Sequence, residues 1–409
     1  MQRTLYLREN PNTMVNKAAI QEKAKALLPR LIEIRRLIHE NPELSFQEHE
    51  TAALVERYLQ QSLGLKTERL ANTGVVATIE GRNPNSKTVG LRADMDALPI
   101  VEVNDGRAYR SKKEGIMHAC GHDAHTTSLL GAATILNELK DQFQGRIKLV
   151  FQPGEEKLPG GASLMINEGV LSDIDVMIGQ HVMPAIYTGK VGFRPGLYMA
   201  STDEIYVKIH GKGGHGAMPH LTVDPIAIAA NLIVALQQIV SRNANPTLPS
   251  VLTFGKIIGN GATNVIPSEV ILEGTFRTLD ETWRTSAHEK MVTMAKGIVE
   301  SMGGTVDFNI VRGYPFLRNN EPLTERCISS ANEYMGSENV EPLGIWMAAE
   351  DFSYYSQEVP SCFYRLGTKS DSKNTGISVH NAGFDIDEDA LEFGCGLLSW
   401  LALNELNHQ

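Results

Sequence analysis

The segment MHACGHDAH, residues 117–125, contains five side chains that can bind a metal. Cys120 and His122 are separated by one small residue, so a thiolate and an imidazole could reach one point from a tight turn. The other interpretation is an ordinary buried cysteine near a surface histidine. Asp123 is expected to cap the following helix. His118 and His125 are assigned no role.

A second segment, FQPGEEKLPGG at residues 151–161, places Glu155 and Glu156 side by side in a turn after a strand. Adjacent side chains in such a turn tend to point to different sides. One carboxylate could therefore bind a metal while the other acts as a general base, which is the division that a hydrolytic metal site needs. The alternative is a solvated acidic turn.

Two histidines could complete a ligand set. His181 ends an apolar strand in IGQHVMP, and His380 lies in the polar loop SVHNAGFDID. Each alone is compatible with a structural role. Together with Cys120, His122 and Glu156, however, they place possible ligands at predicted strand ends and loops, where sites of α/β proteins collect.

Further acidic residues could support such a site. Asp94 and Asp96, in LRADMDALP, are two apart and share one face of a strand. A carboxylate there could hold the second nitrogen of a ligand histidine or touch the metal directly. Glu350 and Asp351, in AAEDFSYY, are a second candidate pair, with a capped helix start as the alternative.

Three polar residues could bind substrate. His215 lies among glycines in GKGGHGAMPH, where the backbone can approach a ligand closely and the imidazole could donate to a developing oxyanion. Asn264 and Arg277 could bind a substrate carboxylate through amide and guanidinium contacts. Arg277 is equally compatible with a charge on a strand surface.

The helices and strands that must position these residues are expected to form two domains, because 409 residues are too many for one compact core of ordinary size. Helices are predicted over residues 16–40, with Pro29 marking a restart or kink, and over 48–63. Apolar strand-like runs then alternate with helices, which is typical of a layered α/β sheet. Residues 193–314 show the order β-α-β-β-α-β of a ferredoxin-like domain. It is inserted in a discontinuous α/β domain formed by residues 16–192 and 315–409.

Composition narrows the classes of function. The net charge is -10 and no Lys/Arg run appears, so nucleic acid is not an expected partner. The four cysteines lack framework spacing, which fits reduced thiols in a cytoplasmic enzyme. The first fourteen residues contain no apolar core, and no segment has ~18 uninterrupted apolar residues, so neither a signal peptide nor a membrane span is predicted.

The motifs, taken in order, resemble the signature blocks of the aminoacylase/carboxypeptidase-G superfamily of metallopeptidases. The resemblance is to its amidohydrolase branch, which includes hippurate hydrolases, N-acyl-amino-acid amidohydrolases and auxin-conjugate hydrolases. It covers nearly the whole chain from about residue 30 and rests on these blocks: IRRLIHENPELSFQE, GLRADMDALPI, MHACGHDAHTTSLLGAA, FQPGEEKLPGGA, GQHVMP, GKGGHGAMPH, NVIPSE and HNAGFDID. It implies a mixed-sheet, di-metal aminopeptidase-like catalytic domain with an inserted ferredoxin-like lid and dimerisation domain.

The resemblance also implies roles for individual residues. Two divalent ions, of zinc, manganese, cobalt or nickel, would be held by five ligands: Cys120, His122, Glu156, His181 and His380. Glu155 would be the general base and Asp94 would lie near the metal-site histidines. His215 would help to bind the reacting carbonyl, often across a dimer interface. One departure is Arg92, which stands where many superfamily members have a ligand histidine.

The activity that the resemblance implies is hydrolysis of the amide bond of small N-acyl amino acids by water that a metal activates. A homodimer or higher homo-oligomer in the cytoplasm is expected. The alternatives are a deacetylase of the N-acetyl-diaminopimelate type, a metallo-dipeptidase or carboxypeptidase, and an inactive metal-binding homologue.

Overall fold

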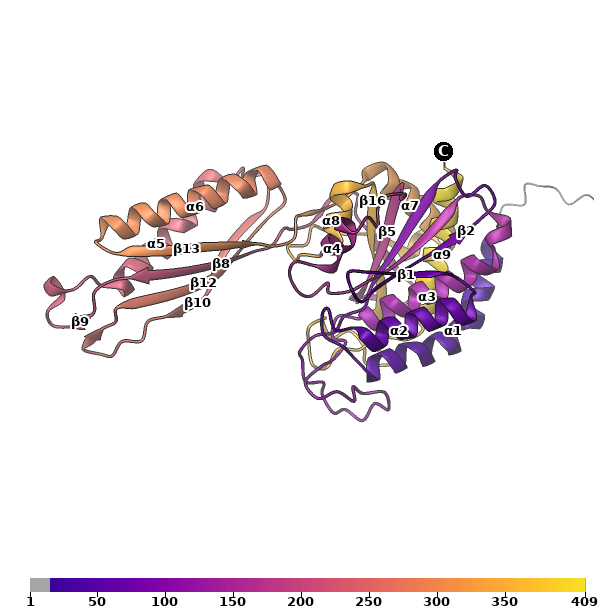
Figure 1. Ribbon diagram of the computed structural model, residues 1–409, viewed down its shortest axis with the longest axis horizontal. Helices are drawn as coiled ribbons and strands as arrows, with labels where there is room; N and C mark the ends of the chain where they lie inside the picture. The colour runs from indigo at the N-terminus through magenta and orange to yellow at the C-terminus, as the bar shows by residue number, and fades with distance from the viewer. Residues whose placement is uncertain (1–14, 409) are drawn as a thin grey trace, which may run out of the picture. The chain divides into compact units, whose positions relative to one another are not determined.

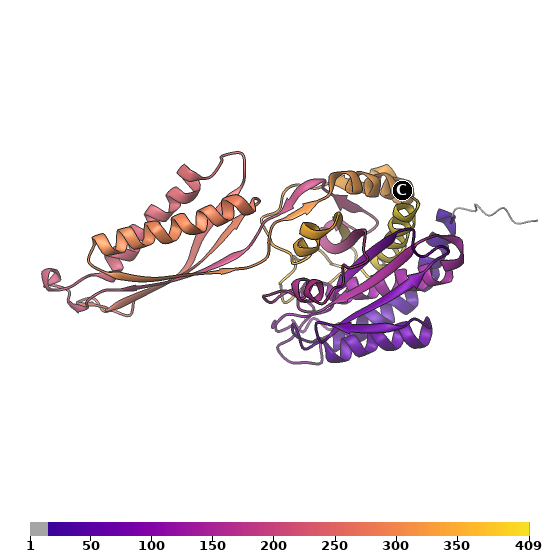
Figure 2. The ribbon, with the colours of Figure 1, turned by 45° about the horizontal axis from the view of Figure 1, so that its top comes forward.

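The computed structural model of the protein describes residues 15–408 and divides into two compact units (Figures 1 and 2). The first unit comprises the chain up to Pro195, Asn319–Leu343 and the chain from Glu358 on. The second comprises Gly196–Arg318 and Gly344–Gln357, so residues 344–357 join it in addition to the predicted insertion. The predicted lack of a signal peptide concerns residues 1–14, which lie outside the described residues.

An eight-stranded mixed sheet forms the centre of the first unit, in the order β1-β2-β4-β3-β5-β16-β6-β15. Its strands are β1 (Thr67–Leu70), β2 (Gly74–Glu80), β3 (Thr88–Asp94), β4 (Arg146–Gln152), β5 (Val176–Tyr187), β6 (Val191–Phe193), β15 (Val340–Pro342) and β16 (Ser361–Lys369). The four central strands β4, β3, β5 and β16 are parallel neighbours. Every residue of β3 is buried, which explains why its sequence does not alternate between apolar and polar residues.

Helices cover this sheet (Figure 1). They are α1 (Lys17–Glu40), α2 (His49–Arg57) with the π-turn η1 (Tyr58–Ser62), α3 (His122–Glu138) with η2 (Lys140–Gln142), α4 (Gly161–Asn167), α7 (Glu321–Met335) with η5 (Ser337–Asn339), and α9 (Ala390–Asn407). α1, α3 and α9 contact one another, and their apolar residues share one core with the strands. α1 runs without a break through Pro29, so the predicted restart there was wrong.

The predicted cap of α3 was also wrong. The residue before the helix is Gly121, at φ +84°, and no side chain caps this end. Asp123 lies in the first turn, where its Oδ2 accepts hydrogen bonds from Arg35 Nε at 2.8 Å and from His39 Nδ1 at 2.7 Å. All three side chains are fully buried. Asp123 therefore joins α3 to α1, because a buried carboxylate requires charged or hydrogen-bonding partners.

The second unit has an antiparallel four-stranded sheet in the order β10-β12-β8-β13, with α5 and α6 packed on one face (Figure 1). The chain order β8-α5-β10-β12-α6-β13 is that of the predicted ferredoxin-like domain. The elements are β8 (Asp203–His210), α5 (Pro225–Gln238) with η4 (Ile239–Asn243), β10 (Ser250–Ile258), β12 (Glu269–Thr278), α6 (Glu281–Ser301) and β13 (Thr305–Arg312). The chain also contains the short pairs β9 (Gly214–His215) with β11 (Val265–Ile266) and β7 (Gly196–Met199) with β14 (Leu317–Asn319), and the helices η3 (Pro219–Leu221) and α8 (Ser353–Glu358). The predicted α/β class with a mixed sheet is confirmed.

One helical stretch among the described residues, Pro225–Asn243, has the length and hydropathy of a membrane-crossing helix. Its residues Ile228, Leu232 and Leu236 are buried in the core of the second unit. The stretch thus contributes one face to that core, as an amphipathic helix does.

Candidate metal centre

Three parallel neighbours of the first sheet bring the candidate residues to one edge. Asp94 is the last residue of β3, and Glu155 and Glu156 follow β4. β3 pairs with β5 up to Gly179, and His181 follows two residues later. β5 continues to Tyr187 and pairs His181 with Arg365 of β16, so the prediction that His181 ends a strand was wrong. The carboxyl ends of parallel strands meet at one edge, which is where such sheets bind ligands.

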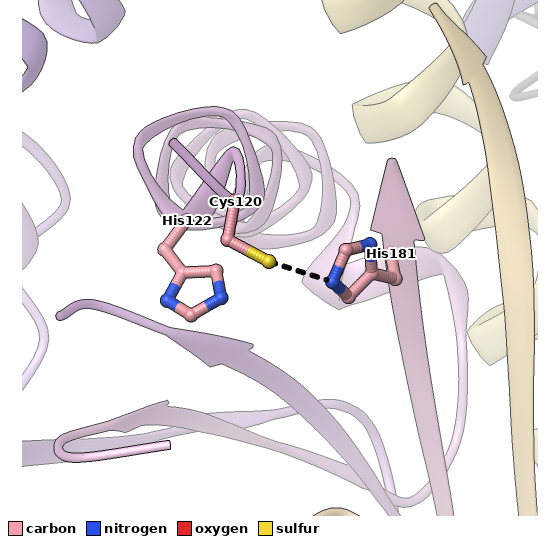
Figure 3. A group of neighbouring side chains, drawn as sticks. All are labelled: Cys120, His122 and His181. Carbon is pink, nitrogen blue, oxygen red and sulfur yellow. Dashed lines mark hydrogen bonds between the residues drawn. The ribbon is translucent and has the colours of Figure 1, made fainter. Parts of the chain in front are cut away.

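Cys120 and His122 reach the same place from the amino end of α3. Figure 3 shows Cys120 between His122 and His181, with Cys120 Sγ 3.4 Å from His181 Nε2. Donor atoms of three overlapping groups lie within 4.8 Å of one another in each group: Cys120, His122 and His181; Cys120, Glu156 and His380; and His122, Glu155 and Glu156. The structure therefore brings together all five predicted ligands and the predicted base.

The two buried histidines have ring orientations that suit metal ligation. His122 Nδ1 donates to Asp96 Oδ1 at 3.1 Å, while its Nε2 is buried and lacks a hydrogen-bond partner among residues 15–408. His181 Nδ1 donates to the carbonyl of Val182 at 2.7 Å, which leaves its Nε2 facing Cys120. A ligand histidine in proteins usually has its other nitrogen bonded in this way. This donor set of thiolate, imidazoles and carboxylate fits a borderline-soft divalent ion.

His380 closes the group on its exposed side. Its backbone has φ +60°, and its amide donates to the carbonyl of Ala119 at 2.7 Å, which joins it to the Cys120 segment. His380 Nε2 lies 3.0 Å from Glu156 Oε1. Hydrogen bonds with Cys120 and Glu156 raise the pKa of His380 to about 10. The positive φ of a non-glycine residue at this point is typical of strain at a functional site.

Glu155 is the acidic residue beside this group. Its side chain is only 9% exposed, and its Oε2 lies 4.0 Å from His122 Nε2. Its neighbour Glu156 donates its backbone N–H to Asp96 Oδ2 at 2.9 Å. Asp96 thus contacts both His122 and the turn that carries the two glutamates.

A second buried network surrounds Asp94. Its Oδ1 accepts from His125 Nδ1 at 2.6 Å, and its Oδ2 accepts from Arg92 Nη1 at 2.7 Å. His125 Nε2 in turn accepts the backbone N–H of Val182 at 2.9 Å. Although burial opposes ionisation of Asp94, Arg92, His122 and His125 hold its pKa well below the usual value. Arg92, the departure from the superfamily pattern, therefore neutralises Asp94.

Sequence reasoning assigned no role to His125. Both of its ring nitrogens are used within the protein, so it connects α3 to the strand that carries His181. The remaining unassigned histidine, His118, is buried, and burial lowers its pKa to about 3. No local pattern indicates the partners of His125, because Asp94 and Val182 are 31 and 57 residues away.

Burial and neighbouring charges set the ionisation of the donors. Burial, together with the Glu156 carboxylate, raises the pKa of the Cys120 thiol. Burial disfavours the His122 imidazolium, but Asp94, Cys120 and Asp96 outweigh it and raise the pKa of His122. Burial and Arg365 hold the pKa of His181 well below its usual value. A neutral His181 keeps the lone pair that a metal ligand needs.

The second unit contains the predicted substrate-binding residues. His215 is exposed on β9 and pairs with Val265, and the Gly216 N–H donates to the Asn264 carbonyl at 2.8 Å, so His215 and Asn264 are neighbours. Arg277 lies near the other end of β12, about 26 Å along the strand from Glu269, which pairs with His210. Within one copy of this unit Arg277 and Asn264 do not share a ligand, and each remains a separate prediction.

The other acidic pair, Glu350 and Asp351, also belongs to the second unit. Glu350 Oε1 accepts the Phe352 N–H at 3.1 Å, and the Glu350 carbonyl accepts the Ser353 N–H. These bonds lie at the start of α8, and both Glu350 and Asp351 also belong to a group of residues that could hold a metal ion, so the two interpretations of this pair remain predictions.

Comparison with known proteins relates this centre to a family. Residues 90–404 match peptidase family M20/M25/M40. The chain is 41% identical over 388 residues to N-acetyl-L-cysteine deacetylase of Bacillus subtilis (strain 168), covering 95% of this chain and 89% of that protein. It is 46% identical over 280 residues to an N-acyl-L-amino acid amidohydrolase of Geobacillus stearothermophilus, covering 68% and 75%.

A solved structure shows the same fold. The YXEP protein of Bacillus subtilis, described as a dinuclear metal binding peptidase from the M20 family, superposes with a TM-score of 0.79 at 32% identity. The match covers 94% of this chain and all of that one. The fold predicted from the sequence and the fold of this relative agree.

Proposed function

We propose, from the premise that this chain belongs to peptidase family M20/M25/M40, that Glu155 is the general base of a two-metal centre that cleaves N-acyl amino acids. The protein is a metal-dependent hydrolase that acts on amide bonds, and its relatives include proteins named as a deacetylase and an amidohydrolase of N-acyl amino acids. The match covers 89% of the length of the N-acetyl-L-cysteine deacetylase.

One observation supports the metal assignment most directly. The buried Nε2 of His122 has no hydrogen-bond partner among the described residues, while Asp96 fixes the other ring nitrogen. An unpaired buried imidazole nitrogen is costly unless something else binds it. Its neighbours are the Asp94 carboxylate, whose Oδ2 lies 3.6 Å away, the Cys120 thiol and the two glutamates. The proposed ligands are Cys120, His122, Glu156, His181 and His380.

Different residues of the protein would have different roles in the reaction. When bound, divalent ions would acidify water and polarise the scissile carbonyl. Glu155 would accept a proton from the attacking water as its oxygen bonds to the carbonyl carbon, and would then donate this proton to the leaving nitrogen as the C–N bond breaks. His215 would stabilise the oxyanion, and Asn264 or Arg277 would bind the substrate carboxylate.

The number and identity of the ions form part of the proposal. The three donor groups overlap at Cys120, His122 and Glu156, which supports two neighbouring ions with a shared ligand. Thiolate and imidazole favour a softer ion such as zinc, whereas carboxylates accept manganese, and cobalt and nickel fit the same donors.

The role of Glu155 can be tested by Glu155→Gln, which keeps the shape of the side chain and removes the base. We expect turnover of hippurate and N-acetyl amino acids to fall at least about 10³-fold, within the range for general-base catalysis. The bound metal, measured by elemental analysis, should stay unchanged. Near-normal turnover would show that another residue is the base. Including dipeptides and N-acetyl-diaminopimelate separates the alternative substrate classes.

We further infer a homodimer in the cytoplasm. β10 is an edge strand of the second sheet, and its Ile257 is 56% exposed, a combination that favours pairing with another copy. The four free buried cysteines support a reducing compartment. Light scattering should give twice the mass of the chain, and Ile257→Lys should shift it toward the monomer. A monomeric wild type would contradict the dimer.

A further inference from the structure

We propose that Glu48 is a positioning residue for Glu155, holding the turn that carries the base from a loop far away in the sequence. The inference rests on the proposed function of Glu155. Glu48 is completely buried and is not a proposed ligand, and its hydrogen bonds go to residues outside the ligand set. A buried carboxylate in that position needs an explanation, because its desolvation is costly.

The contacts of Glu48 identify what it holds. Its Oε1 accepts the backbone N–H of Gly154 and the backbone N–H of Phe46, both at 2.8 Å. Its Oε2 accepts the Thr73 hydroxyl at 2.7 Å. Gly154 directly precedes Glu155, so by accepting this N–H Glu48 holds the Pro153–Gly154 peptide, which enters the turn one residue before the base.

A second carboxylate holds the other side of Glu155. The backbone N–H of Glu156 donates to Asp96 Oδ2 at 2.9 Å, and Ser45 Oγ donates to the same oxygen at 2.6 Å. The N–H groups before and after Glu155 are therefore both bound by buried carboxylates. Ser45 and Glu48 belong to one loop, residues 45–48, which thus binds Gly154 directly and is linked to Glu156 through Asp96.

Tight packing explains why the turn needs such a hold. Gly154 has φ +59°, and a Cβ built on it would lie 2.3 Å from Phe46 Cε1. Phe46 itself has φ +67°, which is unusual for an aromatic residue. The Phe46 ring thus packs directly against the Gly154 backbone, and the shared acceptor on Glu48 joins the N–H groups of the two residues. Strain of this kind persists only where the surroundings over-determine the conformation.

The proposal predicts how catalysis depends on the chemistry of residue 48. Glu48→Gln keeps an oxygen that can accept both N–H groups, so kcat should stay within about 5-fold of wild type. Glu48→Ala removes the acceptor, and Glu48→Asp withdraws it by one methylene. Because a small displacement of a catalytic group can lower a rate about 10²-fold, we expect kcat to fall by about that factor in both variants, with KM nearly unchanged.

The experiment compares these variants, at saturating metal, by steady-state kinetics and thermal unfolding. The matched control is Glu405→Ala, which removes another buried carboxylate of the first unit. Glu405 lies on α9, away from the centre, and binds Lys87 and Arg326. It should lower the unfolding temperature and leave kcat unchanged. If Glu48→Ala does not fold, the comparison of Glu48→Asp with Glu48→Gln decides.

The outcomes separate this inference from the proposed function. Low kcat in Glu48→Ala and Glu48→Asp, restored in Glu48→Gln, supports positioning. Wild-type kcat in Glu48→Asp, or equal losses in the Gln and Asp variants, overturns it. Glu155→Gln is measured in the same series. If it is inactive while the Glu48 variants behave as wild type, only the positioning role fails, whereas an active Glu155→Gln overturns the proposed function itself.

Discussion

His125 lies beside the proposed ligands and binds two other groups instead of a metal. It donates to Asp94 and accepts from the N–H of Val182, next to His181. We expect His125→Ala to weaken metal binding about 10- to 100-fold, as loss of such supporting contacts does. Competition with a chromogenic chelator measures the affinity.

The control for this prediction is His210→Ala. His210 is a partly exposed histidine of the second unit that also contacts a carboxylate, that of Asp307 at 2.9 Å. This variant should keep the wild-type affinity for metal. Equal affinities in His125→Ala and the wild type would show that the hydrogen bonds of His122 with Asp96 and of His181 with the Val182 carbonyl orient the two ligands without help from His125.

The ionisation of Glu48 makes the stability of the protein depend on pH. Burial, and then Asp96, raise the pKa of Glu48 from 4.5 to about 7. Between these values the unfolded chain has lost the proton and the folded protein still holds it, so stability falls as the pH rises. One pKa unit corresponds to about 1.4 kcal/mol, so the decrease amounts to roughly 3 kcal/mol.

Glu48→Gln cannot ionise and should avoid this loss. Its free energy of unfolding relative to wild type should therefore increase between pH 5 and pH 7.5, as measured by urea unfolding at several pH values. A difference that stays constant over this range would mean that Glu48 ionises normally in the folded protein.

At the scale of elements, α1 contains a proline that its packing does not require. Pro29 is exposed in the middle of the helix and leaves the carbonyl of Lys25 without its helical N–H partner. Pro29→Ala should therefore stabilise the protein by about 2 kcal/mol, after allowance for the greater freedom of the unfolded chain. Thermal unfolding measures the gain.

Pro322 provides the matched comparison. It is exposed in the first turn of α7, where a proline removes no helical hydrogen bond. Pro322→Ala should therefore bring no gain. If Pro29→Ala and Pro322→Ala change the stability equally, the position of the proline within the helix does not determine how much it destabilises the protein.

The elements were largely predictable from the sequence because their signals are local. Periodicity and turn residues gave the strands and helices of both units, and the spacing of Cys120 and His122 indicated a ligand pair. Contacts between distant segments were not predictable in this way. Arg35, the partner of Asp123, is 88 residues away, and Gly154 is 106 residues from Glu48. A capping pattern was therefore assigned to Asp123, and Glu48 was not singled out.

At the scale of the whole molecule, the two units have separate apolar cores. The five proposed ligands all belong to the first unit. Metal should therefore stabilise one unfolding transition and leave the other unchanged, because a ligand stabilises only what it binds. At a metal concentration 100 times Kd, the first unit should gain about 2.7 kcal/mol.

Calorimetry of the protein with metal and with a chelator tests this division. Leu232→Ala identifies the transition of the second unit, since Leu232 is completely buried in that core and its truncation costs about 2–5 kcal/mol. We expect the chelator to lower the other transition alone. Cys120→Ala should make that transition less sensitive to the chelator, because a proposed ligand is lost. If both transitions fall together, the units unfold as one and the metal stabilises the entire chain; if neither falls, the proposed ligands do not hold a metal.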